Sequence, residues 1–229
     1  MLRITRGVSR RELLLGGSVA ATLAANSRSA TTGAARPARK FDADRFVADC
    51  RAAALAHPAD SQAAIRELLA SAFGDRNAVL DGLGAPVKGG LKALYRSDTL
   101  TILNIVWSPL MQLLPHEHRM WALIGIYTGR EDNIFWSRTA SGLTATTATA
   151  LSAGAVVPLA SDVIHSVNNP IEKLTGAIHI YGGDFFAVHR SEWDPDTLIE
   201  RDWSIRAAVR NFEESNARFA AGACATNKP

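Results

Sequence analysis

Cysteine is scarce in this sequence, with Cys50 and Cys224 as the only two among 229 residues. Two cysteines are too few for the disulfide framework that holds small secreted domains together, and too few for a metal site built from thiolates. A single bridge between Cys50 and Cys224 is left open by the sequence. Any metal site must therefore use other side chains.

Long hydrophobic runs and internal repeats are also missing. A transmembrane helix needs about 20 consecutive apolar residues, and the sequence contains no such segment. The chain is nevertheless 47% hydrophobic, which is ample for a packed core at a length of 229 residues. We expect one enzyme-sized domain with extensions.

The chain after residue 40 has no strong excess of positive or negative charge. The whole chain has a formal net charge of +3, from 25 basic and 22 acidic residues. Eight of the basic residues and one of the acidic residues lie in 1–40, so the remainder has 17 against 21 and a net charge of −4. A mildly acidic body has no electrostatic footprint for nucleic acid, and we expect no nucleic-acid partner.

The first 40 residues have the layout of an export signal followed by a linker. Arg10 and Arg11 follow Ser9 and precede a short run of small apolar residues over 13–25. This arginine pair resembles the twin-arginine class of bacterial signals, which implies export of a folded protein to the periplasm or the outside. The export machinery would then be a partner, with no membrane association after processing. The alternative is a disordered basic extension on a cytoplasmic protein.

The spacing of apolar residues changes twice after residue 40. Over 41–90 it is helical and indicates two helices around a turn at His57 and Pro58, with His57 at the surface or at a helix end. Helical spacing returns within 191–229 and predicts an extension that packs outside the central domain. Between them, 91–190 contains short β-rich runs typical of a sandwich or barrel, at 94–96, 100–107, 118–127, 133–138, 155–159, 163–167 and 177–181.

The sharpest local motif is His116-Glu117-His118. Residues two apart on a strand point to the same face, so this spacing can bring two imidazoles to one metal ion. Such a pair alone is a weak signal, because exposed histidine pairs are common. Here Pro115 precedes the pair and Gly129 closes the next strand at a fixed interval.

A second histidine motif follows, with Pro158, His165 and Asn169. Together the two motifs resemble the two-motif layout of the cupin superfamily, although the second has lost its glycine and has a longer spacing. The resemblance implies a double-stranded β-helix, or jelly-roll barrel, and makes His116, His118 and His165 the metal ligands. Ala122 occupies the position where the family pattern has a glutamate, so the acidic fourth ligand is missing.

Three neutral imidazoles leave the full +2 charge on a bound ion, whereas a carboxylate would cancel part of it. Such an ion favours anionic ligands. An octahedral Fe(II) with three protein ligands keeps three positions for a bidentate substrate and O₂, and a thiolate suits its charge and softness. The sequence does not select the metal, so Mn, Ni and Zn stay open beside Fe(II). We expect no organic cofactor.

The run at 177–181 alternates so that Ala177, His179 and Tyr181 share one face. An inward histidine and tyrosine need hydrogen-bond partners. One reading is a core histidine bonded to a tyrosine or to backbone. Because the run follows a strand with a metal-binding histidine, the other reading is a pair that orients the metal site and its substrate.

Five sequence blocks together resemble the thiol dioxygenases, the cysteine dioxygenase group of cupins, and more closely their uncharacterised bacterial relatives described as metal-dependent double-stranded β-helix enzymes. The resemblance spans roughly 94–186, and the blocks are 94–98, 115–122, 129–133, 162–170 and 179–185. It implies that the histidines bind Fe(II), that Arg96 holds a substrate carboxylate, and that Tyr181, with its hydroxyl fixed by His179, reaches toward sulfur and oxygen. Two departures are Ala177 in place of a serine, and Ala122 and Leu123 near the position of a cysteine that the animal enzymes cross-link to their tyrosine.

Residues beside the motifs admit other roles. Arg96 could pair with Asp98 at a strand edge, in which case Arg119 could replace it as the anion clamp. Trp121 is expected on the inward face with His118, where it would wall the pocket. Glu117 is expected to point away and to be solvated.

The preferred hypothesis is an Fe(II)-dependent thiol dioxygenase-like enzyme. It would oxidise a small thiol carboxylate, of the cysteine or 3-mercaptopropionate type, to a sulfinate with O₂ as the second substrate. The alternatives are another metal-cupin enzyme, such as a carbon-cleaving dioxygenase or an isomerase, and a non-catalytic cupin that binds a metal or a small molecule.

Overall fold

The computed structural model describes residues 40–140 and 142–226 of the chain, with the side chains after residue 221 left out. These residues belong to one compact unit. The predicted export signal and the side chain of Cys224 lie outside the described residues. Within the described part, no helix is long and apolar enough to span a membrane.

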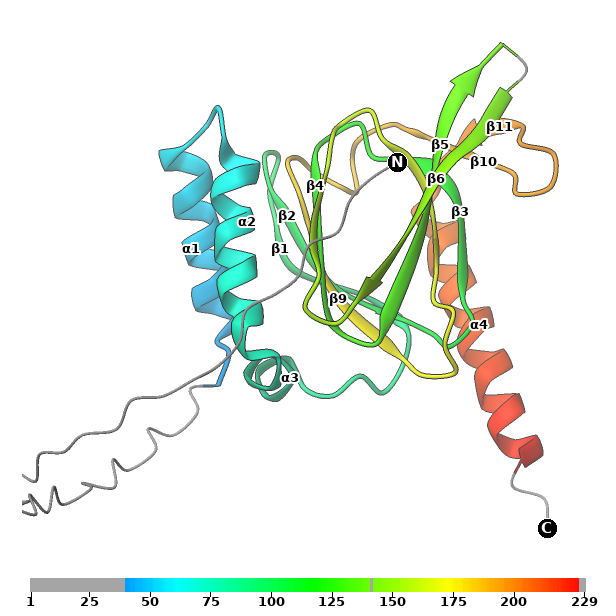
Figure 1. The fold of residues 1–229 in the computed structure, drawn as a ribbon, viewed down its shortest axis with the longest axis horizontal. Helices are drawn as coiled ribbons and strands as arrows, with labels where there is room; N and C mark the ends of the chain where they lie inside the picture. The colour runs from blue at the N-terminus through cyan, green and yellow to red at the C-terminus, as the bar shows by residue number, and fades with distance from the viewer. Residues whose placement is uncertain (1–39, 141, 227–229) are drawn as a thin grey trace, which may run out of the picture. The chain divides into compact units, whose positions relative to one another are not determined.

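Two antiparallel sheets face each other and form the barrel (Figure 1). The five-stranded sheet has the order β1-β2-β9-β4-β7 and the six-stranded sheet the order β11-β10-β3-β8-β5-β6. The five-stranded sheet comprises β1 (Gly90–Arg96), β2 (Thr101–Trp107), β4 (Ala122–Thr128), β7 (Val156–Leu159) and β9 (Thr175–Tyr181). The six-stranded sheet comprises β3 (Gln112–Glu117), β5 (Arg130–Thr139), β6 (Gly142–Ser152), β8 (Ile164–Asn168), β10 (Ser191–Trp193) and β11 (Glu200–Asp202). The predicted mainly β fold, a double-stranded β-helix with N-terminal helices and a C-terminal helix, is confirmed.

Strand alternation sends the side chains of the five-stranded sheet into two cores. On β9, Ala177 and Tyr181 face the barrel interior, whereas Ile178 and Ile180 belong to a second cluster on the opposite face. This sheet is therefore buried on both faces, by the other sheet on one side and by the N-terminal helices on the other.

The N-terminal helices cover the outer face of the five-stranded sheet (Figure 1). They are α1 (Ala43–Ala56), α2 (Ser61–Ala72), a 3₁₀ turn η1 (Phe73–Asp75) and α3 (Arg76–Leu83). Asp42 caps α1 by accepting a hydrogen bond from the Arg45 backbone N–H. His57 is exposed and caps the C-terminal end of α1, as predicted. Cys50 on α1 is a free thiol and is fully buried in the cluster between the helices and the sheet.

The C-terminal helix α4 (Ile205–Thr226) packs against the barrel. Phe212 on α4 inserts into the interior cluster, where its ring stacks on Trp107 with centroids 5.4 Å apart. The sequence predicted a helical stretch here, but its first part folds instead as the short strands β10 and β11.

The predicted strand over 118–127 is wrong at its start. β3 ends at Glu117, residues 118–121 form a connection, and β4 begins at Ala122. Arg119 has a φ of 55°, in the left-handed region, which is incompatible with a continuous strand. The sequence reading also missed β6, whose exposed alternation of threonine and alanine has no hydrophobic signature, and the helix α3.

Candidate metal centre

Strand register brings the three predicted histidines together. In the antiparallel pair β3 and β8, His116 lies opposite His165. His118 follows directly after the end of β3, and its ring lies 4.9 Å from that of His116 and 5.0 Å from that of His165, centroid to centroid. One ring nitrogen from each histidine lies within 4.8 Å of the others. In the described part of the chain, no carboxylate or thiol belongs to this group.

Burial keeps all three imidazoles neutral at physiological pH. It lowers the pKa of His116 to about 4. It also lowers the pKa values of His118 and His165 well below their ordinary range, with a further contribution from neighbouring imidazoles. Neutral imidazole is the form that offers a lone pair to a metal ion.

Hydrogen bonds on the far side of two rings leave the inner nitrogens free to bind metal. The Nδ1 of His116 donates to the Leu114 carbonyl at 2.9 Å, and the Nδ1 of His165 lies 2.7 Å from Oδ1 of Asn133. The Nε2 atoms of His118 and His165 approach each other to 2.9 Å, and Nδ1 of His118 is buried without a partner. Converging, neutral and buried imidazoles fit a divalent transition metal.

Ala122 confirms the loss of the acidic position of the motif. It is fully buried on β4 and pairs in register with Tyr181 on β9. The side chain at this position packs in the interior cluster of the barrel, where alanine offers no ligand atom to a metal.

His179 and Tyr181 lie beside the histidine group and line the same small cavity. The Nδ1 of His179 is 3.2 Å from the Tyr181 hydroxyl oxygen, and the Tyr181 ring lies 4.9 Å from the ring of His118. Burial raises the pKa of the Tyr181 hydroxyl, so this group keeps its proton. The structure therefore brings five of the six predicted site residues together.

Arg96, the sixth predicted site residue, lies elsewhere. Its guanidinium forms a two-point pair with the Asp184 carboxylate at 2.9 and 2.8 Å, and half of its side chain is exposed. Its partner is Asp184 rather than Asp98. Arg119, the predicted substitute, pairs with Glu117 at 2.6 Å. Neither arginine lines the cavity of the three histidines.

Two predictions about the neighbours of His118 are wrong. Glu117 is only 7% exposed, because Arg119 and Arg138 pair with its carboxylate. Trp121 packs with the cluster between the sheet and the N-terminal helices, away from the histidines. The error for Trp121 arose because the strand rule was applied across residues 118–121, where the chain turns. Glu117 still lies within β3, and its burial depends on the two arginines that pair with it.

The sequence analysis did not predict the buried carboxylate of Glu131. Glu131 on β5 is completely buried and accepts hydrogen bonds from Trp107 Nε1 at 2.7 Å, Asn133 Nδ2 at 3.0 Å and His179 Nε2 at 3.2 Å. In the sequence it lies between Arg130 and Asp132, which gives it the appearance of a charged turn. Strand alternation could have predicted its burial, because it puts Glu131 and Asn133 on the same face of a strand.

A buried guanidinium was missed as well. Arg190 is 1% exposed and lies between the rings of Phe185 and Trp203, with its guanidinium carbon 4.3 and 3.6 Å from the ring centroids. Its Nη1 donates to the Phe185 carbonyl at 2.6 Å, whereas Nε and Nη2 are buried without partners. Burial lowers the pKa of Arg190 to about 10, so the group remains charged at neutral pH.

The space beside the histidines is small, at about 20 Å³. This is room for about one water molecule. Phe185, Trp203 and Phe212 contribute to its walls. A substrate larger than water can enter only if these side chains move.

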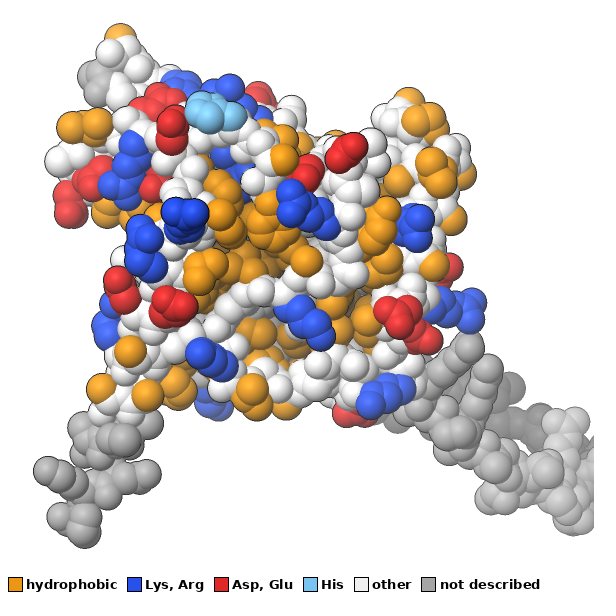
Figure 2. All heavy atoms as spheres, turned by 180° about the vertical axis from the view of Figure 1, so that it is seen from behind, with side chains coloured by type: hydrophobic (Ala, Val, Ile, Leu, Met, Phe, Trp, Pro, Cys, Tyr) orange, Lys and Arg blue, Asp and Glu red, His pale blue; other side chains and the backbone are white. Residues whose placement is uncertain are grey.

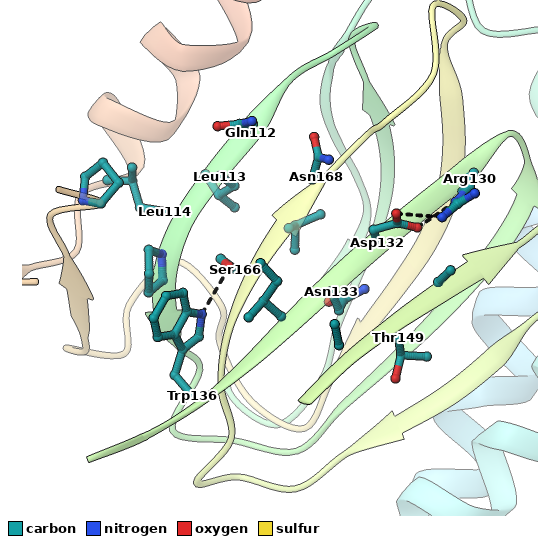
Figure 3. Close-up of a pocket in the computed structure, with 16 residues that line it drawn as sticks. Gln112, Leu113, Leu114, Arg130, Asp132, Asn133, Trp136, Thr149, Ser166 and Asn168 are labelled. Atoms are coloured by element: carbon teal, nitrogen blue, oxygen red, sulfur yellow. Dashed lines mark hydrogen bonds and ion pairs between the residues drawn. The ribbon is translucent and has the colours of Figure 1, made fainter. Parts of the chain in front are cut away.

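A wider hollow, of about 590 Å³, lies on the other face of the six-stranded sheet and excludes the three histidines (Figure 3). Its walls include the hydrogen bond from Trp136 to Ser166 and the ion pair of Arg130 with Asp132. Figure 2 shows basic and acidic side chains interspersed on the face seen from behind, with apolar side chains toward its middle. We place the candidate site at the histidines, because the wider hollow has no converging metal ligands.

Comparisons with known proteins concern the fold alone. No family model matches the chain, and no curated protein matches it. Among solved structures, it is similar to an RmlC-like cupin with a double-stranded β-helix fold from Methanocaldococcus jannaschii, at 12% identity and a TM-score of 0.38 over 44% of this chain and 86% of that one. An uncharacterised conserved protein with a double-stranded β-helix domain from Klebsiella pneumoniae matches at 11% identity and a TM-score of 0.38, over 46% and 82%.

An oxalate decarboxylase variant from Bacillus subtilis matches at 15% identity and a TM-score of 0.36, over 44% of this chain and 27% of that one. At these values the likenesses carry no argument about activity. The fold description rests on the strand order of the chain itself.

Proposed function

We propose that this chain is an Fe(II)-dependent thiol dioxygenase-like enzyme that oxidises a small thiol carboxylate to a sulfinate. The observation that carries the proposal is a set of three buried, neutral histidines that converge without a carboxylate, beside a protonated tyrosine hydroxyl. The reaction adds both atoms of O₂ to sulfur and converts RSH and O₂ into RSO₂H. Its atoms and electrons balance without a reductant.

His116, His118 and His165 would hold the metal. When bound, the metal would supply an uncompensated positive charge and a redox-active centre at which a thiolate and O₂ can meet. The chain contributes an enclosure that excludes water, because each of the three rings is at most 5% exposed. Electrostatic interactions are stronger in such an enclosure than in solvent.

Tyr181 would position the reacting sulfur and oxygen atoms. His179 takes up one side of the tyrosine hydroxyl, which restricts the direction in which that group can interact. The hydroxyl has a single proton, which it can give either to Nδ1 of His179 or, as the reaction proceeds, to negative charge on oxygen or sulfur. Burial, which raises the pKa of Tyr181, keeps this donor available.

Arg190 would hold the carboxylate of the substrate, in place of Arg96. Its guanidinium does not itself line the small cavity, but it packs on two residues that do, Phe185 and Trp203. The Nε and Nη2 atoms form one edge of the guanidinium, and such an edge binds a carboxylate through two parallel hydrogen bonds. Both atoms are buried without a partner, a costly arrangement for a cation.

O₂ consumption is the direct test. The Fe(II)-loaded full-length protein is given cysteine, 3-mercaptopropionate and related thiols, with His165→Ala as the control. We expect thiol-dependent O₂ uptake with sulfinate as the product, and no uptake by the variant. Protein shown to hold one iron per chain that consumes no O₂ with any thiol would refute the proposal and favour another metal-cupin reaction, tested with diketones and flavonols.

The small cavity favours a second candidate, a cupin that binds metal without catalysis. About 20 Å³ of free space suits an ion with a water molecule better than a thiol carboxylate. This candidate predicts stoichiometric metal in the purified protein and no turnover with any of these substrate classes. Substrate-dependent turnover would exclude it.

A further inference from the structure

The buried Glu131 connects two parts of the candidate site, the pair of His179 with Tyr181 and the metal-ligand candidate His165. Its Oε2 atom receives the N–H groups of Trp107 and His179, and its Oε1 atom receives the side-chain amide of Asn133. The residue is 0% exposed, so no solvent competes for these bonds. The indole N–H of Trp107 and the amide N–H of Asn133 can only donate, so both carboxylate oxygens act as acceptors, and we take the third partner, Nε2 of His179, as a donor as well.

The first consequence concerns His179. Because Nε2 of His179 faces the carboxylate at 3.2 Å, this nitrogen must carry the ring proton. A neutral imidazole then has its lone pair on Nδ1, which faces the Tyr181 hydroxyl at 3.2 Å. His179 is therefore the acceptor and Tyr181 the donor in this bond.

The second consequence concerns the metal ligand His165. Since the amide nitrogen of Asn133 is turned toward Glu131, its carbonyl oxygen faces Nδ1 of His165 at 2.7 Å. An oxygen acceptor requires the ring proton on Nδ1. The lone pair of His165 is then on Nε2, the atom that faces His118 across the candidate metal position.

We propose that Glu131 is a positioning residue that sets the tautomers of two histidines at once, directly for His179 and through Asn133 for His165. One buried carboxylate thereby prepares both the lone pair that binds metal and the acceptor that orients Tyr181. The inference rests on the proposed metal site, but it requires neither iron nor thiol oxidation.

Glutamine at position 131 keeps the shape of the side chain and replaces one acceptor oxygen by a donor. The fewest mismatches arise when the new amide nitrogen faces Asn133, because the remaining oxygen can still accept from Trp107 and His179. Asn133 must then turn its amide and present a donor to Nδ1 of His165. The ring proton of His165 would move to Nε2, and the lone pair would leave the metal position.

Imidazole ¹⁵N NMR on the full-length protein reports the tautomers directly. In the metal-free wild type we expect His165 protonated on Nδ1 and His179 on Nε2. E131Q should shift the His165 proton to Nε2, and the affinity for Zn²⁺ should fall about 10- to 100-fold, the usual effect of losing a group that orients a metal ligand. Trp107→Phe, which removes a donor to the same carboxylate, should leave both tautomers unchanged.

Tyr127→Phe is the matched control for affinity. It also removes one side-chain hydrogen bond, a part-buried one to Asn104, but on the helix-covered face of the sheet. Its Zn²⁺ affinity should equal that of the wild type. A folded E131Q with wild-type tautomers and wild-type affinity would overturn the inference.

If E131Q fails to fold, the wild-type spectrum alone decides. His165 protonated on Nε2, or His179 protonated on Nδ1, would overturn the inference without any variant. The two hypotheses fail separately, because a protein without thiol-dependent O₂ uptake can still have these tautomers and this Zn²⁺ dependence. A protein with O₂ uptake can equally lack them.

Discussion

The five-stranded sheet separates two cores that bury different chemistry. On the side of the N-terminal helices, Ile65 and Leu69 from α2 pack at 0% exposure against Leu123 and Ile180. On the barrel side, apolar residues share the interior with the three histidines and their polar partners. Apolar burial stabilises the fold, whereas each buried polar group costs free energy unless it is paired. The helix-covered core therefore mainly stabilises the fold. The barrel interior contributes less free energy of folding, because it buries the polar groups of the candidate site.

Loss of a metal ligand should show the largest difference between the two cores. His165→Ala removes one of three ligands, and we expect the Zn²⁺ affinity to fall by more than about 100-fold, beyond the effect of losing an outer hydrogen-bond partner. Competition with a chelator measures this affinity. Wild-type affinity in the variant would mean that the three histidines are not the metal site.

Leu69→Ala tests the opposite core. Removal of this fully buried side chain should lower the free energy of unfolding by about 2–5 kcal/mol, through lost burial and the cavity left behind. Urea denaturation measures the loss. Since Leu69 packs on the far side of the sheet, the folded variant should bind Zn²⁺ as the wild type does. A large change in affinity would show that the two cores are coupled.

Arg190→Met distinguishes a substrate anchor from a structural cation. If Arg190 holds the substrate carboxylate, KM for 3-mercaptopropionate should rise about 10- to 100-fold, the value of hydrogen bonds to a charged group. KM for cysteamine, which has no carboxylate, should change little. Arg96→Met, in which a surface pair with Asp184 is lost, is the matched control and should leave both constants unchanged. Equal effects on both thiols would point to a packing role.

The pH dependence of stability should come from the barrel side. The pKa of His116 falls from 6.5 in the unfolded chain to about 4 in the fold, so below pH 6.5 the unfolded chain takes up a proton that the folded protein does not. Stability should therefore fall as the pH drops from 6.5 toward 4, and His116 should account for about 1.4 kcal/mol per pH unit.

His116→Gln should remove this share of the slope, measured on the metal-free protein by urea denaturation at several pH values. Leu69→Ala should lower the stability at every pH and keep the slope. An unchanged slope in His116→Gln would assign the pH dependence to other groups.

Local patterns predicted most of the barrel strands and the three histidines that the fold brings together. His116 and His118 were recognised by their spacing, and His165 by the second motif of the resemblance. The pattern failed where the chain turns, because Arg119 adopts a left-handed conformation that no alternation rule anticipates. Trp121 was misplaced for that reason, whereas the burial of Glu117 depends on its ion pairs with Arg119 and with Arg138 from β5.

The sequence by itself determined the strand alternation, the helical segments and the inward faces of His179 and Tyr181, because these depend on residues a few positions apart. Only the tertiary structure decided which charged groups enter the interior. Glu131 meets His179 across 48 positions of the chain and Trp107 across 24. Such pairings depend on sheet register and on the closure of the barrel, through which distant segments come to share one small, dry volume.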